Sequence, residues 1–338
     1  MGDILNTSVS HVASLPMPLR REEAMPDSGP AVDRTQPKVA PLAWRLRAIV
    51  GERNVRADEP MSGHTTFEVG GPADLFVVPE DPDEVREVLS VVREAGVPYF
   101  VLGRGSDLVV SDEGFRGVVV SLAEGLVGVT VEGTQMTCQA GVDLREASEM
   151  ACELGLTGLE FACGIPGSVG GACFMNAGAY DGCVADVLSE VRVLTPEGDV
   201  RDLGVDELEL GYRRSRVASD GLVVLSATFA LSRGDGERIR ATMDDLMERR
   251  RSKQPLELPS AGSTFKRPEG YFAGKLISDA GLRGWRCGGA AVSEKHAGFV
   301  VNVGGATAAD VHAVIAHVQD EVERQFGVRL EPEVRFLG

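Results

Sequence analysis

A glycine-rich stretch, residues 155–182, contains the residue types best suited to binding a phosphorylated ligand. It reads GLTGLEFACGIPGSVGGACFMNAGAYDG, with glycines at positions 164, 167, 170 and 171. Glycine has no Cβ and tolerates positive φ, so successive backbone N–H groups can converge there on an anion or a flat ring. The spacing matches neither a nucleotide P-loop nor the G-x-G-x-x-G dinucleotide pattern. We therefore expect a wall for a phosphorylated cofactor; the alternative is a packing turn between two sheets.

A second glycine turn, Gly103 to Asp107, follows an apolar run over residues 97–102 that is typical of a buried strand. Ligands of open α/β sheets bind at the carboxyl ends of such strands. Gly103 and Gly105 begin a G-x-G-x-x-G pattern, but Leu108 breaks it. The pattern favours a turn that cradles a pyrophosphate over a Rossmann site, and a plain connection between strands is the other interpretation.

Hydroxyl, cationic and acidic groups gather toward the end of the chain. The run RRRSK at 249–253 is its densest positive cluster, and forms either a solvated helix end or part of a site. Shortly after it, SAGSTFK at 260–266 supplies a hydroxyl beside a glycine and a further cation. The segment LEPEVRF at 330–336 alternates with period two, which places Glu333 and Arg335 on one strand face. Taken alone, GYRRS at 211–215 indicates a solvated loop.

The composition excludes several classes of protein. Hydrophobic residues make up 43% of the chain and charged residues 25%, as in an ordinary soluble protein. The net charge of −17 argues against nucleic-acid binding, because the phosphate backbone would be repelled. The six cysteines form no C-x-x-C pair, so we expect no metal and reduced thiols in a cytoplasmic protein. Neither a membrane span nor a signal peptide is expected.

The elements that position these groups can be predicted from periodicity. Residues 1–42 lack a periodic pattern, so we expect a disordered N-terminal tail. A strand near 73–78, a helix that begins at Asp81-Pro82 and ends near Gly96, and the strand over 97–102 predict a βαβ unit with parallel strands. The other predicted elements are strands near 127–131 and 135–140, a helix over 144–154, a hairpin about 196–198, a strand over 222–231, helices around 239–247 and 271–281, strands near 284–291 and 298–303, and a helix over 308–326.

Taken together and in this order, these motifs resemble the UDP-N-acetylenolpyruvoylglucosamine reductase (MurB) family. The resemblance runs from about residue 43 to the end, and the segments that carry it are HTTFEVGGPADLFVVP at 64–79, VLGRGSDLVVSDEGFRGVVV at 101–120, GLEFACGIPGSVGGACFMNAGAY at 158–180, GYRRS at 211–215, RRSKQP at 250–255, SAGSTFK at 260–266, AVSEKHAGFVVN at 291–302 and LEPEVRFLG at 330–338. Any one segment is moderately specific, whereas the ordered set is very specific.

The resemblance implies a mixed α+β and α/β fold in three domains, with an FAD-binding fold of the vanillyl-alcohol-oxidase (PCMH) type. The implied ranges are a tail at 1–42, FAD-binding subdomains at 43–125 and 126–235, and an α+β substrate domain at 236–338 whose last strand returns to the active site. Only about 40 residues separate Arg213 from Lys253, too few for the tyrosine-bearing insertion of one family branch. The chain resembles the shorter branch.

The implied activity is that of a UDP-N-acetylmuramate dehydrogenase. Such an enzyme uses noncovalent FAD, and NADPH as co-substrate, to reduce the enolpyruvyl ether of UDP-N-acetylglucosamine to UDP-N-acetylmuramate, a cytoplasmic step of peptidoglycan precursor synthesis. No nucleic acid, membrane insertion or obligatory protein partner is implied. Two alternatives stay open: a flavoprotein oxidase of the same cofactor fold, and a catalytically silent nucleotide-sugar sensor.

The resemblance also assigns residues to roles. Hydride addition to an enol ether beside a carboxylate builds an enediolate-like intermediate, which needs charge stabilisation and one proton. By motif match, Arg213 and Glu333 hold that carboxylate and Ser263 donates the proton. The cations expected to bind the diphosphate and carboxylate are Lys253, Lys266 and Arg335. The residues expected to bind FAD are Gly103, Gly105, Ser106, Asp107, Gly164, Ile165, Gly167, Ser168, Gly170, Gly171, Asn176, Gly178 and Tyr180.

Four positions depart from the family pattern. Asp107 stands where the family usually has Asn in a GSN turn, which places an acid near a diphosphate. Asp181 and Cys183 depart from the usual AYG-x-E, and Arg267 replaces a frequent Asn after FK. The functional consequences of these departures do not follow from the sequence.

Overall fold

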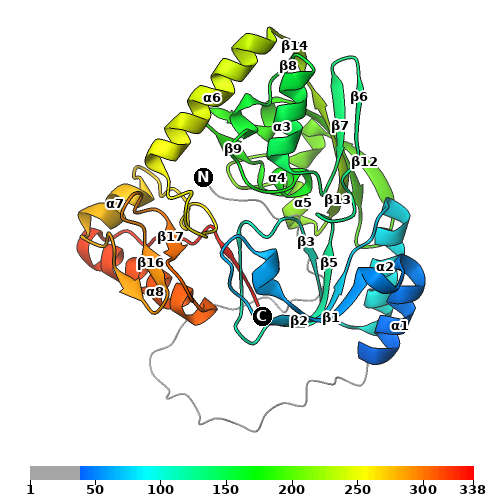
Figure 1. The fold of residues 1–338 in the computed structure, drawn as a ribbon, viewed down its shortest axis with the longest axis horizontal. Coiled ribbons are helices and arrows are strands. Elements are labelled where there is room, and N and C mark those ends of the chain that lie inside the picture. The colour runs from blue at the N-terminus through cyan, green and yellow to red at the C-terminus, as the bar shows by residue number, and fades with distance from the viewer. Residues whose placement is uncertain (1–38) are drawn as a thin grey trace.

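The computed structural model describes residues 39–338, which form three sheet-containing units arranged around a central space (Figure 1). The predicted disordered tail lies outside the described residues up to position 38. Its predicted end at residue 42 is wrong, because helix α1 (Val39–Val50) already begins at Val39 and buries Leu42 and Leu46. The apolar side chains of α1 pack on the first unit and offset the entropy of ordering these residues.

The first unit is a four-stranded sheet of order β1-β2-β5-β3. Its elements are β1 (Val55–Pro60), β2 (Pro72–Val77), α2 (Pro82–Ala95), β3 (Tyr99–Leu102), β4 (Leu108–Val110), which lies outside this sheet, and β5 (Phe115–Ser121). Helix α2 confirms the sequence prediction: the Asp81 side chain accepts from the Glu84 N–H, and Gly96 ends the helix in the left-handed region. Strands β2 and β3 are both parallel to β5, which lies between them.

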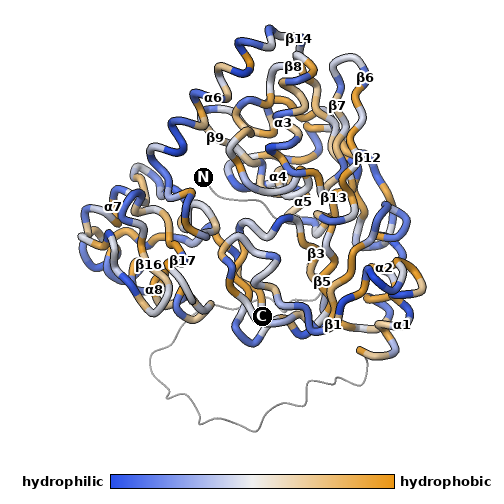
Figure 2. The backbone as a smooth tube through the Cα atoms, in the orientation of Figure 1, coloured by the Kyte–Doolittle hydropathy of each residue, from blue (hydrophilic) through white to orange (hydrophobic). Residues whose placement is uncertain are grey.

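The second unit is a five-stranded antiparallel sheet of order β12-β11-β13-β7-β6. The sheet is covered by α3 (Leu144–Glu153) and α4 (Val169–Met175) (Figure 1). Its other elements are β6 (Val129–Glu132), β7 (Gln135–Gln139), β8 (Leu156–Thr157), β9 (Gly178–Ala179), β10 (Gly182–Cys183), β11 (Leu188–Leu194), β12 (Val200–Gly204), α5 (Arg216–Ser219), β13 (Val223–Ala230) and β14 (Ser232–Arg233). One continuous apolar core joins this sheet to the first unit, and Figure 2 shows apolar residues along the central strands.

The third unit has its own apolar core. It contains α7 (Ala273–Asp279), β15 (Arg286–Cys287), β16 (Ala290–Val292), β17 (Val300–Asn302) and α8 (Ala308–Phe326). Helix α8 has the predicted bounds, with a capping box of Thr307 and Asp310 at one end and left-handed Gly327 at the other. Helix α6 (Gly236–Lys253) precedes this unit and packs on the second one through Ile239 and Met243. The predicted boundary near residue 235 therefore stays a prediction.

The chain returns to the first unit at its end. Strand β18 (Arg335–Leu337) pairs in parallel with β4, in the register Arg335 to Leu108 (Figure 1). The Asp112 carboxylate of the first unit also accepts from the N–H groups of Ala308 and Ala309, at 2.7 and 2.9 Å, at the N-terminus of α8. Both contacts anchor the third unit on the first. Among residues 39–338, no helix is long and apolar enough to cross a membrane.

Candidate active site

A buried ion pair joins two segments that lie far apart in the sequence. The Arg213 Nε donates to Glu333 Oε1 at 2.6 Å, and only 6% and 1% of the two side chains are exposed. Arg213 lies in the loop before α5 with a φ of 53°, a conformation that costs free energy for a residue other than glycine. The surrounding structure therefore holds Arg213 in a strained conformation that presents its guanidinium to Glu333.

Ser263 lies beside this pair through main-chain pairing. Gly262 takes a φ of 69°, which turns the chain just before the serine. The next residues pair with the C-terminal segment, because the Glu333 N–H donates to the Thr264 carbonyl at 2.8 Å and the Lys266 N–H donates to the Glu331 carbonyl at 2.9 Å. The serine, the guanidinium and the carboxylate, predicted from three distant segments, are therefore brought together.

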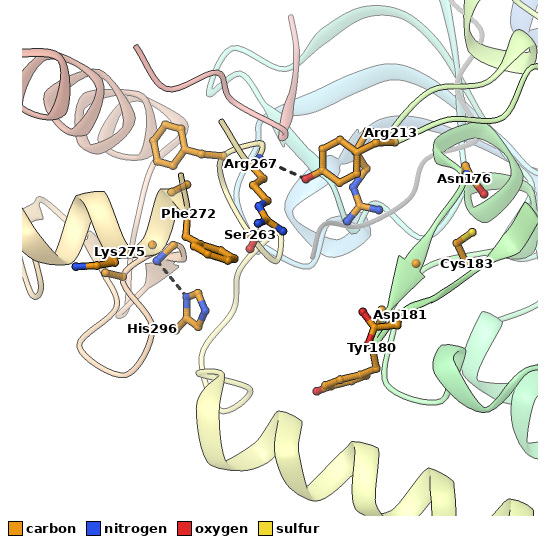
Figure 3. A pocket seen from close by; sticks show the side chains of 18 of the residues that line it. Asn176, Tyr180, Asp181, Cys183, Arg213, Ser263, Arg267, Phe272, Lys275 and His296 are labelled. Atoms are coloured by element: carbon orange, nitrogen blue, oxygen red, sulfur yellow. Dashed lines mark hydrogen bonds between the residues drawn. The ribbon is translucent and has the colours of Figure 1, made fainter. Parts of the chain in front are cut away.

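Ser263 and Arg213 line one cavity of about 1010 Å³ between the second and third units. Figure 3 shows them in the same part of the cavity, with His296 near Ser263 and with Tyr180 beside Asp181 farther along the wall. Asn176 connects the wall to the Arg213 loop, because its Nδ2 donates to the Gly211 carbonyl at 3.1 Å and its Oδ1 accepts from the Ala185 N–H at 3.0 Å. The cavity is large enough for a ligand of nucleotide size.

The wall from the third unit is positively charged. Four cationic side chains and one histidine contribute to it, against the carboxylates of Asp181 and Asp279: Arg267, Lys275, Arg283, Lys295 and His296. Lys275 pairs with Asp279 at 2.5 Å. In a chain of net charge −17, this excess of positive charge favours an anionic ligand.

His296 is a neutral hydrogen-bond donor in this cavity. Burial lowers the pKa of its imidazole, so the neutral form predominates at pH 7. Its Nδ1 accepts from the Gly298 N–H at 3.1 Å, which leaves the proton on Nε2. Neither His296 nor the four cations was predicted as a site residue; the motif AVSEKHAGFVVN was the available signal, but periodicity gave it no role.

None of the three predicted substrate cations lines the cavity. Lys253 is exposed at the end of α6, outside the cavity wall. Lys266 pairs with Glu331 at 3.2 Å on the surface. Arg335 lies beside Asp107, with its guanidinium carbon 5.0 Å from the centroid of the Phe174 ring. Their predicted contact with substrate stays a prediction that this geometry does not support.

The two predicted cofactor loops lie against each other. The Ser106 Oγ donates to the Pro166 carbonyl at 3.3 Å, and the Arg104 Nε donates to the Asp143 carboxylate at 2.8 Å. Gly105 has a φ of 62°, and a Cβ there would lie 1.8 Å from the His64 carbonyl oxygen. Only glycine fits this close approach. Gly103 lines a separate cavity of about 300 Å³ at the end of β3.

The glycine-rich wall is built differently from the expectation. Gly170 and Gly171 lie inside α4, and their N–H groups donate to the Ala140 carbonyl and the Ser168 Oγ. Of the four glycines that were expected to allow positive φ, only Gly167 adopts it, at 137°. Position 164 is glycine because a Cβ there would lie 2.8 Å from the Arg250 Cδ. The predicted convergence of N–H groups from residues 170 and 171 on an anion is therefore wrong.

The residues present nevertheless fit a flavin dinucleotide. The 103–107 turn and the 164–168 loop meet at the junction of the first two units, where the Ser106 hydroxyl donates to the Pro166 carbonyl. Ile165 and Ser168 of the second loop are buried, whereas Gly178 and Tyr180 line the cavity. A phosphate-bearing, ring-bearing cofactor matches the small, polar character of these loops.

Comparison with known proteins agrees with this arrangement. A family model described as "FAD binding domain" matches residues 73–204, and one described as "UDP-N-acetylenolpyruvoylglucosamine reductase, C-terminal domain" matches residues 254–337. The UDP-N-acetylenolpyruvoylglucosamine reductase of Clostridium perfringens is 55% identical over 293 residues, which cover 87% of this chain and 96% of that protein. The corresponding protein of Geobacillus kaustophilus is 53% identical over 294 residues, 87% of this chain and 96% of that protein.

A solved structure shows the same fold. The crystal structure of the reductase from Thermus caldophilus matches with a TM-score of 0.72 and 34% identity, over 82% of this chain and 97% of that chain. The match covers nearly the whole of the solved structure. By its fold, its two matching family models and its identity to these relatives, the chain belongs to the UDP-N-acetylenolpyruvoylglucosamine reductase (MurB) family.

Proposed function

We propose that this chain is an FAD-dependent oxidoreductase that reduces UDP-N-acetylenolpyruvoylglucosamine to UDP-N-acetylmuramate in peptidoglycan precursor synthesis. Relatives that are 55% and 53% identical to this chain carry the name of this reductase, and residues 73–204 match an FAD-binding domain. The observation that carries the proposal is the cavity in which Ser263 lies beside the buried pair of Arg213 and Glu333.

The chemistry of the substrate explains why these three groups are needed together. The enolpyruvyl ether carries its carboxylate directly on the double-bond carbon that also bears the ether oxygen, so hydride addition at the terminal carbon moves negative charge onto that carboxylate. When bound, FAD supplies this hydride after its reduction by NADPH. The Arg213 guanidinium, held by Glu333, stabilises the developing charge, and the Ser263 hydroxyl gives its proton to the adjacent carbon.

NADPH as reductant and the cytoplasm as location are also parts of the proposal. The positively charged cavity wall suits phosphate groups, which both the sugar nucleotide and NADPH carry. One cavity thus serves both ligands in turn, because the oxidised dinucleotide leaves before the sugar nucleotide enters. All six cysteines are free thiols, as expected in a reducing compartment.

The experiment is an anaerobic assay of the purified protein. Denaturation should release a yellow flavin, and NADPH should be oxidised beyond one equivalent per flavin only when the enolpyruvyl sugar nucleotide is present, with one product molecule per NADPH. Oxygen consumption without the sugar nucleotide would identify the oxidase alternative. Protein that stays free of flavin after reconstitution, yet binds the sugar nucleotide, would identify the sensor alternative.

A further inference from the structure

The C-terminal segment carries two charged residues that enter the protein at alternate positions. Glu333 meets Arg213 of the second unit at 2.6 Å. Two residues later, Arg335 begins β18, and its N–H donates to the Asp107 carbonyl at 3.0 Å. The segment therefore contacts the second unit through one side chain and the first unit through the next charged residue.

The Asp107 carboxylate also attracts the Arg335 guanidinium beside this main-chain bond. Asp107 is completely buried. Burial lowers the pKa of the Arg335 guanidinium, and the attraction of the Asp107 carboxylate opposes this effect. The Arg335 guanidinium also faces the Phe174 ring of α4, 5.0 Å from its centroid. Arg335 is therefore a half-buried cation with a carboxylate and an aromatic face around it.

We propose that Asp107 is a positioning residue for the reduction, whose carboxylate balances Arg335 and so holds the last strand where Glu333 meets Arg213. The inference rests on the proposed function and adds a role that the sequence did not give: Asp107 was expected at the cofactor and Arg335 at the substrate. It assigns a purpose to the acid that stands here in place of the Asn usual in this family.

The physical reason is the charge of the strand. A half-buried guanidinium without a compensating charge loses part of its hydration and gains no attraction in return, and a neutral amide at position 107 would supply only a dipole. Main-chain pairing with Leu108, Val109 and Val110 would still hold β18. The strand would then relax to expose more of the Arg335 guanidinium to water, and a shift of a few tenths of an ångström is enough to lengthen the bond of 2.6 Å between Arg213 and Glu333.

A double-mutant cycle of Asp107→Asn and Arg335→Gln tests the pair in the holoenzyme. Asp107→Asn should slow the reoxidation of the reduced flavin by the sugar nucleotide about tenfold, and should leave its reduction by NADPH within about twofold. Arg335→Gln alone leaves a buried carboxylate uncompensated, so the double variant should melt at a higher temperature than the single Arg335→Gln variant. The higher melting temperature of the double variant tests the pair even when Asp107→Asn alone folds poorly.

Asp74→Asn is the matched control, because Asp74 is also buried in the first unit and pairs with Arg116 at 3.0 Å, away from β18. It should lower the melting temperature without changing reoxidation. Two results would overturn the proposal. One is a rate loss in the double variant that equals the product of the losses in the two single variants; the other is an Asp107→Asn protein that binds FAD more tightly while both half-reaction rates stay unchanged. Absence of turnover in the wild type would refute the proposed function, whereas the melting cycle would still report on the pair.

Discussion

Replacing Glu333 by Gln removes one charge from the buried pair with Arg213 and keeps the shape of the side chain. Because the two side chains are 1% and 6% exposed, water cannot take over the lost interaction. Breaking a buried pair costs about 3–5 kcal/mol, and the retained amide oxygen places Glu333→Gln at the lower end, near 3 kcal/mol. For a chain of this size we expect the melting temperature to fall by about 6 °C.

The kinetic effect should be larger than the effect on folding. Arg213 stabilises charge that develops only while the sugar nucleotide is reduced, so loss of its orientation should slow flavin reoxidation by about 10²–10³. Reduction of the flavin by NADPH does not develop charge at this pair and should change by less than about threefold. Anaerobic stopped-flow absorbance measures the two half-reactions separately.

Glu331→Gln is the matched control. Glu331 lies two residues earlier in the same segment, but its pair with Lys266 is on the surface, with 74% and 44% of the side chains exposed. Such pairs contribute about 0–1 kcal/mol, so its melting temperature and both rates should stay close to the wild type. A Glu333→Gln protein that behaves like this control in both assays would refute the argument from burial.

Three further predictions concern the cofactor turn, the cavity wall and pH. Gly105→Ala should lower the free energy of unfolding by at least about 3 kcal/mol and lower the flavin content, because its Cβ would lie 1.8 Å from a carbonyl oxygen. Gly133→Ala is the control, since Gly133 has a nearly equal φ and nothing within 4 Å of the added Cβ. It should lower the free energy of unfolding, measured with denaturant, by about 1 kcal/mol. Arg267→Ala should raise the KM for the sugar nucleotide about tenfold, whereas Lys266→Ala should not if the cavity geometry, rather than the motif match, identifies the substrate cations. Burial lowers the pKa of His296 in the folded protein, so below the ordinary histidine pKa of 6.5 the unfolded state binds more protons than the folded state. The free energy of unfolding should therefore fall as the pH drops below 6.5. In His296→Gln this fall should be less steep.

Local sequence patterns located the helices and strands well. The cap at Asp81, the end at Gly96 and the whole of α8 follow from rules that involve only neighbouring residues. The insertion of β5 between β2 and β3 and the pairing of β18 with β4 were not predicted, because both depend on contacts between residues distant in sequence. The start of α1 was missed because its apolar side chains are buried only in the folded protein.

The candidate site, like the fold, was predicted only in part from the sequence. The family resemblance identified Arg213, Ser263 and Glu333, and the structure brings them together. The need for cations at the diphosphate and carboxylate suggested Lys266, but its side chain pairs with Glu331 on the surface. Composition likewise suggested a phosphate cradle at Gly164, whereas the glycine there makes room for a buried arginine of α6. Packing between the units decides which way a side chain points, and residue spacing in the sequence carries no information about that packing.

The most direct test of the central claim is Ser263→Ala, studied in both half-reactions without oxygen. With Ser260→Ala as the control from the same segment, we expect reduction of the flavin by NADPH to stay within about twofold and reoxidation by the enolpyruvyl sugar nucleotide to slow at least about 100-fold. Equal losses in both half-reactions, or reoxidation at the wild-type rate, would contradict the assignment of Ser263 as the proton donor.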